Sequence, residues 1–223
     1  MTGTELLPSL TQILVTSAGL ALLALIPLVV ISATCFTKFL MVLALLRNGL
    51  GLPQLPPTLV LTTLALILTA AVMHPVLGSV GTGLANIPID PALWLAEPER
   101  TLDLFKVAME PWRAFLQANS GDAELAWLAP GLDPATDRVP WTAALPAFML
   151  TELGDALRIG VLILLPLLVV DLVVGTLLLS LGMHMLNPTS VSLPFKLLLF
   201  LGIGGWLTLS EGVMATYTIP VLP

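Results

Sequence analysis

The sequence predicts an all-α membrane protein built from two long hydrophobic helical hairpins and a small, partly helical polar insert. The 223-residue chain is 57% hydrophobic and only 10% charged, and its mean hydropathy is +1.01, whereas soluble domains carry about 25% charged residues. Its apolar residues gather in four blocks, and most of the charge lies between the second and third blocks. We therefore divide the chain into a first hairpin (1–85), an acidic insert that we expect outside the cytoplasm (86–145) and a second hairpin (146–223).

The first hairpin contains two apolar blocks joined by a well-marked turn. Block one runs from about Leu10 to Leu46 and carries no charge until Lys38, and block two runs from about Thr58 to Val80. Stretches of about 18 or more apolar residues are long enough to cross a bilayer as helices. Because no base precedes Lys38, we expect no cleaved signal peptide. The turn between the two blocks is predicted at Arg47, Asn48, Pro56 and Pro57.

The second hairpin is predicted to be longer than a membrane is thick. Block three covers Ile159 to Leu181, and its helical pattern extends back to Pro146 with Pro166 as the only strong breaker. A helix of that extent measures about 54 Å, whereas the hydrocarbon layer of a bilayer is about 30 Å thick. The excess length favours a packed helical assembly over isolated membrane spans.

Block four, from Leu197 to Leu209, is marginal as a membrane span. Only 14 uncharged residues separate Lys196 from Glu211, and a short turn at Asn187-Pro188 connects this block to block three. Glycines favour close contact with a neighbouring helix over exposure to lipid. Block four contains three of them, Gly202, Gly204 and Gly205.

The insert is acidic and partly helical. Between Asp90 and Asp155 there are 11 acidic and 4 basic residues. Polar residues from Asp103 to Gln117 recur every three or four positions, which predicts an amphipathic helix with a kink at Pro111, and a second short helix is expected at Asp122–Ala129. Basic turns and an acidic insert favour turns in the cytoplasm and the insert outside. No basic patch exists, so we expect no nucleic acid as a partner. The apolar blocks make membrane lipid an expected partner.

The sequence contains no recognisable catalytic or cofactor-binding arrangement. It lacks a glycine-rich phosphate loop and a Gly-x-Ser-x-Gly elbow, so we expect no enzyme activity and no cofactor. The two histidines, His74 and His184, are 110 residues apart and Cys35 is the only thiol, so we expect no metal site. We interpret His74 as the end of the second helix and Cys35 as a small buried apolar residue.

Charges inside the apolar blocks are the candidate functional residues. A charge in a membrane-grade helix costs about 3 kcal/mol on insertion scales. We therefore favour a buried ion pair between Asp171 and Lys196, although Asp171 could instead relay protons or bind backbone donors. Near the start of block three, Asp155 and Arg158 could form a local pair. Alternatively, contacts between subunits could involve Glu152, Asp155 and Arg158.

Eight short segments match, in order, those of a known protein family. They are Leu45–Gly51, Pro56-Pro57, Met73–Val76, Leu145–Phe148, Thr151–Leu153, Leu168–Val173, Gly182–Met185 and Ser192–Phe200. The resemblance covers almost the whole chain, from Leu22 to Met214, and only the insert matches loosely. By these segments the chain resembles the FliP/SctR family, the export-gate proteins of bacterial type III secretion systems in flagella and injectisomes.

The resemblance implies a structural role in protein secretion. Members of the family form a pentameric ring with two smaller partners, of the FliQ/SctS and FliR/SctT types. The complex is the portal through which unfolded secreted polypeptides cross the bacterial inner membrane. The resemblance implies that the two hairpins assemble into a helical ring that projects toward the periplasm. The lack of a signal peptide resembles injectisome members more than flagellar ones.

The resemblance also implies a pore gasket in the turn after block three. Family members usually carry three consecutive methionines there, at the positions of Met183, His184 and Met185, so His184 departs from the pattern. Gly154 and Gly204 also depart, because they stand where the family usually has lysine and often has aspartate. The alternative is that Met183 and Met185 fill gaps in ordinary helix packing.

Three functions of different classes follow from these features. The leading one is a structural pore-forming subunit of the type III secretion export gate. The second is a small ion-coupled membrane transporter that uses Asp171, and it differs from the first in needing no ring. The third, an intramembrane enzyme, lacks a nucleophile–base pair in the sequence.

Overall fold

The computed structural model describes residues 17, 19–21, 24–25, 27–29, 31–52, 54–88, 97–133 and 137–220. Every regular element in this part of the chain is a helix, so the predicted all-α fold class is confirmed. Most of the first apolar block before residue 31 lies outside the described residues, and so does the N-terminal segment in which we expect no cleaved signal peptide. The helices are α2 (Phe36–Gly49), α3 (Thr58–Ala85), α5 (Pro98–Ala108), α6 (Glu110–Ala118), α7 (Asp122–Leu128), α8 (Trp141–Ser180), α9 (Pro188–Gly202) and α10 (Gly205–Met214).

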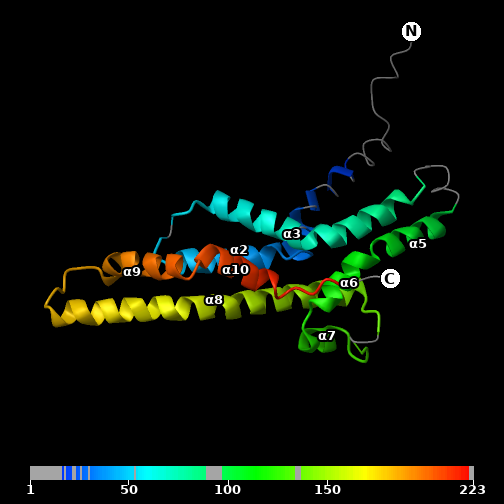
Figure 1. Cartoon of the computed structure of the whole chain (residues 1–223). Coiled ribbons are helices and arrows are strands. Elements are labelled where there is room, and N and C mark those ends of the chain that lie inside the picture. The colour runs from blue at the N-terminus through cyan, green and yellow to red at the C-terminus, as the bar shows by residue number, and fades with distance from the viewer. Residues whose placement is uncertain are drawn as a thin grey trace, which may run out of the picture.

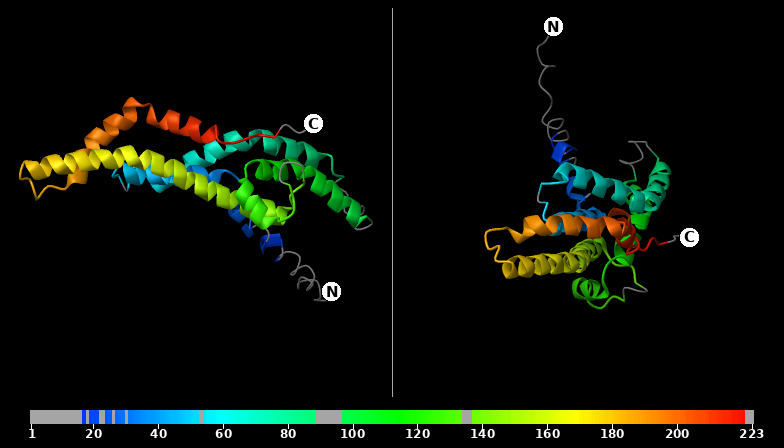
Figure 2. Two further views of the ribbon diagram at one scale, coloured as in Figure 1. Left: turned by 90° about the horizontal axis from the view of Figure 1, so that it is seen from below. Right: turned by 60° about the vertical axis from the view of Figure 1, so that its left-hand side comes forward.

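The molecule is elongated along helix α8 (Figure 1). Helices α2 and α9 lie alongside α8, and α3 lies on the other side of α2 (Figures 1 and 2). Helices α6 and α7 pack against the first part of α8, α5 packs against α3, and the turn from α8 to α9 forms the opposite end of α8 (Figure 1). The two predicted hairpins therefore pack against each other, because α2 of the first contacts α8 of the second more extensively than it contacts its own partner α3.

Helix α8 is a single helix of 40 residues that includes both Pro146 and Pro166. It begins at Trp141, within the range we assigned to the insert, because Ala144, Ala147 and Phe148 are fully buried and stabilise its first turns. At the usual rise it is about 60 Å long. Only 17% of its most apolar stretch is buried within the chain. A helix this long and this exposed needs further partners, either lipid or protein.

Helix α3 is longer than block two and corrects our interpretation of His74. It runs through His74 and Pro75 to Ala85, so His74 lies inside the helix and not at its end. A proline removes one backbone hydrogen bond, which an apolar helix tolerates where its neighbours compensate. Gly78, Gly81 and Gly83 all lie within this helix. At Gly83 a Cβ would lie 2.9 Å from the Cα of Ala108, so glycine permits the crossing of α3 and the insert.

Block four is divided between two helices and is not one continuous helix. Helices α9 and α10 meet at a bend of 59°. Gly204 has a φ of +66°, a left-handed conformation that glycine adopts without strain. A Cβ on Gly205 would collide with the ring of Phe200. Two of the three glycines in block four therefore form a bend, whereas Gly202 has no neighbour close to the position of its missing Cβ.

The predicted amphipathic helix of the insert is split in two. Helix α5 ends at Ala108 and α6 begins at Glu110, so the break falls at Met109, two residues before the expected kink. Pro111 lies in the first turn of α6, where its missing N–H leaves no carbonyl unsatisfied. The second short helix, α7, ends at Leu128, one residue before the predicted end.

An aromatic core joins the insert to both hairpins. The ring of Phe115 on α6 lies 5.9 Å from that of Phe148 on α8 and 6.1 Å from that of Tyr217, centroid to centroid. Tyr217 also lies 6.1 Å from Phe39 on α2. These side chains come from four different segments, so the core holds α2, α6, α8 and the C-terminal segment together.

Candidate functional site

Asp171 and Lys196 lie together between the helices of the second hairpin. The Nζ of Lys196 is 2.6 Å from Oδ2 of Asp171, and Ser192 donates a hydrogen bond to Oδ1 of the same carboxylate. Lys196 also donates to the carbonyl oxygen of Gly49 at 2.9 Å. We call Asp171, Ser192, Lys196 and the Gly49 carbonyl the hairpin cluster. Both carboxylate oxygens of Asp171 therefore have partners inside the chain.

The hairpin cluster ties the second hairpin to the end of α2. The Lys196 side chain is only 2% exposed, while that of Asp171 is 28% exposed. The C-terminal end of a helix carries a partial negative charge, which favours a cation there. Lys196 thus neutralises both a carboxylate on α8 and the last turn of α2. The contact fixes the position of α8 and α9 relative to the end of α2, beyond which the two helices extend without α2.

The predicted turn between α2 and α3 is held by Arg47. Its Nη1 donates to the Pro56 carbonyl at 3.4 Å and to Oγ1 of Thr58 at 3.1 Å. Asn48 contributes its backbone carbonyl, which accepts from the Gly51 N–H at 3.0 Å. Arg47 therefore joins the end of one helix of the hairpin to the start of the next.

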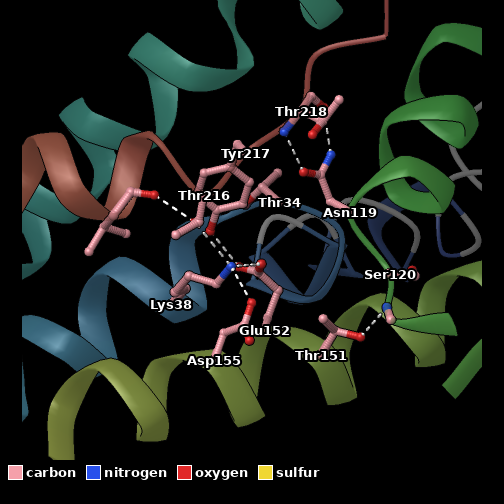
Figure 3. A network of polar contacts seen from close by, with 12 residues as sticks. Thr34, Lys38, Asn119, Ser120, Thr151, Glu152, Asp155, Thr216, Tyr217 and Thr218 are labelled. Atoms are coloured by element: carbon pink, nitrogen blue, oxygen red, sulfur yellow. Dashed lines mark hydrogen bonds and ion pairs between the residues drawn. The ribbon is translucent and has the colours of Figure 1, made fainter. Parts of the chain in front are cut away.

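A second cluster of buried charges lies at the start of α8, and sequence reasoning missed it (Figure 3). Lys38 on α2 places its Nζ 2.8 Å from Oε1 of Glu152 and 3.2 Å from Oδ2 of Asp155. The hydroxyl of Tyr217 donates to Oε2 of Glu152 at 2.6 Å. The Lys38 ammonium also lies 4.4 Å from the Tyr217 ring centroid, a cation–π distance. We call Lys38, Glu152, Asp155 and Tyr217 the core cluster.

The core cluster is more deeply buried than the hairpin cluster. The side chain of Glu152 is fully buried and that of Lys38 is 3% exposed, whereas Asp155 reaches the surface with 34% exposed. Burial, together with the negative charge of Glu152, raises the pKa of the Tyr217 hydroxyl well above its usual range. Tyr217 therefore stays protonated and serves Glu152 as a hydrogen-bond donor.

The C-terminal segment, residues 215–218, packs against the core cluster (Figure 3). The side chain of Asn119 on α6 exchanges two hydrogen bonds of 2.8 Å with the backbone of Thr218. The Nζ of Lys38 donates to Oγ1 of Thr216 at 3.4 Å. The segment thus connects the insert, α2 and α8 through polar contacts on either side of Tyr217.

The three charged residues that we considered for a local pair or for contacts between subunits, Glu152, Asp155 and Arg158, therefore divide into two sets. Glu152 is fully buried inside its own chain, and Asp155 pairs with Lys38 instead of with Arg158. Arg158 is exposed on the outer side of α8. The signal that could have revealed the core cluster was Lys38 itself, because it is the first base of the chain and stands alone in an apolar block. The same cost argument that singled out Asp171 applies to it.

The turn between α8 and α9, which carries Met183, His184 and Met185, forms the free end of the second hairpin (Figure 1). We call it the methionine turn. Met185 is 99% exposed and Met183 is 48% exposed. Gly182 turns the chain with a φ of +74°, and the side chain of Asn187 accepts from the Thr189 N–H at 3.0 Å to begin α9. Met185 therefore fills no gap within its own chain. Within the described residues, His184 takes part in no group of ligands that could hold a metal ion.

The insert contains a third set of charges, around Glu110. Its carboxylate accepts from Nε of Arg113 at 3.0 Å and from the guanidinium of Arg138. Arg113 in turn donates to the Val139 carbonyl at 2.8 Å, which holds the return loop against α6. Burial alone would raise the pKa of Glu110, but its hydrogen bonds and charge attraction to Arg113 and Arg138 outweigh burial and hold that pKa below its ordinary value.

The lowered pKa of Glu110 predicts that the insert loosens in acid. Its contribution to stability is present above the ordinary carboxylate pKa and is lost as the pH falls through the lowered one. Hydrogen exchange of the α6 amides is expected to accelerate over that acidic range, and Glu110→Gln should exchange faster already at neutral pH. The matched control is Glu99→Gln, since Glu99 is exposed in the first turn of α5. Identical exchange profiles for both variants would contradict the role of Glu110.

The fold and its buried charges define a class of protein: an all-helical, strongly apolar one whose hairpins are joined by ion pairs. Two described helices, α3 and α8, are long and apolar enough to cross a membrane, and α9 with α10 would make a third span if the bent pair counts as one. The model of the FliP family matches residues 20–213, so the chain belongs to the FliP family. The resemblance noted in the sequence is confirmed.

The chain is similar over most of its length to proteins of several bacteria, three of which follow. The chain is 37% identical to Yop proteins translocation protein R of Yersinia pestis, over 89% of this chain and 93% of that protein. It is 39% identical to the flagellar biosynthetic protein FliP of Cereibacter sphaeroides, over 96% of this chain and 69% of that protein. It is 37% identical to the hypersensitivity response secretion protein HrcR of Ralstonia nicotianae, over 87% of this chain and 93% of that protein.

Proposed function

We propose that this chain is a structural, pore-forming subunit of the type III secretion export gate in the bacterial inner membrane. Its relatives carry names from protein translocation, flagellar assembly and secretion. One observation carries the proposal beyond family membership. The α8–α9 hairpin is an apolar arm that ends in an exposed methionine turn and buries little of its surface within its own chain. Such an arm is suited to line a channel with other copies.

The proposed assembly is a homo-oligomeric ring, expected to be a pentamer, with one partner of the SctS/FliQ type and one of the SctT/FliR type. Large apolar residues along α8 are exposed to half or more of their surface, which an unpartnered soluble surface would not tolerate. They include Val161, Leu162, Leu165, Leu168, Val169 and Leu172. Neighbouring copies and membrane lipid would cover this face. The insert and the body would project to the periplasmic side, while secreted polypeptides pass through the centre.

Native mass spectrometry of the purified protein tests the ring directly. The protein is measured in mild detergent, alone and co-expressed with both partners. We expect one dominant homo-oligomer and masses that increase by whole partner subunits. A chain that stays monomeric under both conditions would exclude the gate and leave the transporter as the better candidate.

The methionine turn is the proposed gasket of the channel. Methionine side chains are flexible and apolar, so a ring of them can collapse, exclude water and yield to a passing polypeptide. The exposure of Met185, at 99%, fits this role better than the gap-filling alternative. The histidine between the two methionines is polar and would hold water in the constriction.

Replacing both Met183 and Met185 with alanine is expected to raise small-ion conductance through the assembled gate. The smaller side chains leave the constriction open, so leakage should rise about tenfold or more while assembly is kept. His184→Met should lower the leakage, because a third apolar side chain makes the constriction easier to dewet. Conductance of complexes reconstituted in planar bilayers provides the measurement. The matched control is Met109→Ala with Met149→Ala, which makes the same chemical change away from the turn. Equal leakage in the gasket variant and this control would place the constriction elsewhere.

The transporter alternative requires an available carboxylate at Asp171. Both oxygens of Asp171 are engaged, one by Lys196 and the other by Ser192. A carboxylate neutralised in this way is poorly suited to bind a transported cation or to relay a proton. The geometry of the hairpin cluster therefore favours the structural role.

A further inference from the structure

Apart from Arg47, which holds the turn between α2 and α3, two charged side chains on the described apolar helices remain outside both clusters. They are Arg158 on α8 and Glu211 on α10, and both are exposed. Within the described part of the chain, neither side chain forms an ion pair or a hydrogen bond. Each stands among exposed apolar residues, with Leu162 beside Arg158 at 65% exposed and Leu207 near Glu211 at 66% exposed.

The surroundings of the two charges are apolar enough that they need partners. When such a surface is covered by lipid or protein, an unpaired charge on it is costly. Covering by lipid would leave both charges unpaired. Covering by a second copy of the same chain can pair them, because they are of opposite sign.

The two charges lie at the same level along the molecule. An apolar groove of about 390 Å³ runs between α8 and the bent pair α9–α10. Its α8 wall includes Ile159, the residue after Arg158, and its α10 wall includes Gly212, the residue after Glu211. The groove separates the two helices at this point, so Arg158 and Glu211 do not meet within one chain. They are carried by different helices at a matching height.

A matching height on two different helices is what a closed ring requires. In a ring with cyclic symmetry, neighbours are related by rotation about one axis, so contacting residues of adjacent copies lie at the same level along it. The elongated body of Figure 1 would stand with α8 along that axis. The outer face of α8 in one copy would then meet α10 of the next.

We propose that Arg158 of one copy pairs with Glu211 of the next copy and so sets the contact between neighbours in the ring. The apolar residues around each charge form the surrounding contact, and the ion pair fixes its register. The contact is head-to-tail, since the two faces differ, and it therefore repeats around a ring instead of stopping at a dimer. This inference rests on the proposed ring and names the residues that build it.

Chemical cross-linking tests the pairing. The protein carries Arg158→Cys and Glu211→Cys in a Cys35→Ala background. It is treated in membranes with a bifunctional maleimide that links thiols about 10 Å apart. That length suits two positions that are normally bridged by two long side chains. We expect a ladder of products above the dimer. Each single cysteine variant should give no ladder. A dimer as the only product of either single variant would show a two-fold contact and overturn the proposal.

Charge exchange supplies the second arm of the test. Arg158→Glu and Glu211→Arg, each alone, should lower the yield of the ring about tenfold through like-charge repulsion, and the two together should restore it. Arg100→Glu is the matched control, because Arg100 is exposed on the insert. If the singles lower the yield and the double variant does not restore it, the partner is a different protein or lipid and the proposal fails. If the unmodified protein forms no ring, the proposed function itself fails first.

Discussion

Replacing Lys38 with methionine is expected to destabilise the protein more than any other single substitution in the core cluster. Methionine keeps the apolar bulk of the lysine stem but removes the ammonium group. Among the described residues, Lys38 is the only cation in an ion pair with Glu152, which is fully buried. A buried charge left without its partner costs about 3–5 kcal/mol. We expect a loss of that order in the free energy of unfolding.

The opposite substitution should be milder, because the cluster is asymmetric. In Glu152→Gln, Lys38 still pairs with Asp155, which is partly exposed, so the expected cost is about 1–3 kcal/mol. Combining Lys38→Met with Glu152→Gln should recover part of the loss caused by Lys38→Met alone. Chemical unfolding in mild detergent, followed by circular dichroism, measures all three variants. The control is Lys106→Met, whose exposed pair with Asp103 should contribute little. A double variant that loses as much as the two single variants together would show that the charges are not coupled.

The hairpins and the hairpin cluster could be predicted from the sequence because their signals are local. A long apolar run with few breakers predicted the extent of α8, and proline with asparagine predicted the turn before α9. Asp171 and Lys196 stood out because each is a charge in an apolar helix, and two helices of one hairpin are adjacent by necessity. The third and fourth members of that cluster, Ser192 and the Gly49 carbonyl, carry no such signal in the sequence.

The core cluster could not be predicted in the same way because its members are distant in sequence. Lys38 and Glu152 come from different hairpins, and Tyr217 from the C-terminal segment. Only the tertiary packing of α2 on α8 brings them together. The predictions of where helices end near His74 and Gly204 were wrong for a related reason. A proline or glycine in an apolar stretch either continues or bends a helix, and the packing of its neighbours decides which.

Asp171→Asn is expected to weaken the joint between the second hairpin and the body of the molecule. Asparagine retains the hydrogen bond to Ser192 but leaves the Lys196 ammonium, only 2% exposed, with the Gly49 carbonyl as its remaining partner. The expected loss in the free energy of unfolding is about 3–5 kcal/mol. Lys196→Gln should cost less, because Asp171 is partly exposed and water can solvate its carboxylate.

The two substitutions together distinguish a coupled pair from two independent charges. With Asp171→Asn and Lys196→Gln combined, no charge remains buried at the joint, so stability should exceed that of Asp171→Asn alone. Unfolding in detergent measures stability, and the yield of assembled complex measures whether the hairpin still leaves the body in the correct direction. Asp103→Asn is the control, since Asp103 forms an exposed pair with Lys106 and should change neither readout. A double variant no more stable than Asp171→Asn would mean that Lys196 is held chiefly by the end of α2. In that case the joint would depend on the last turn of α2 and not on the ion pair.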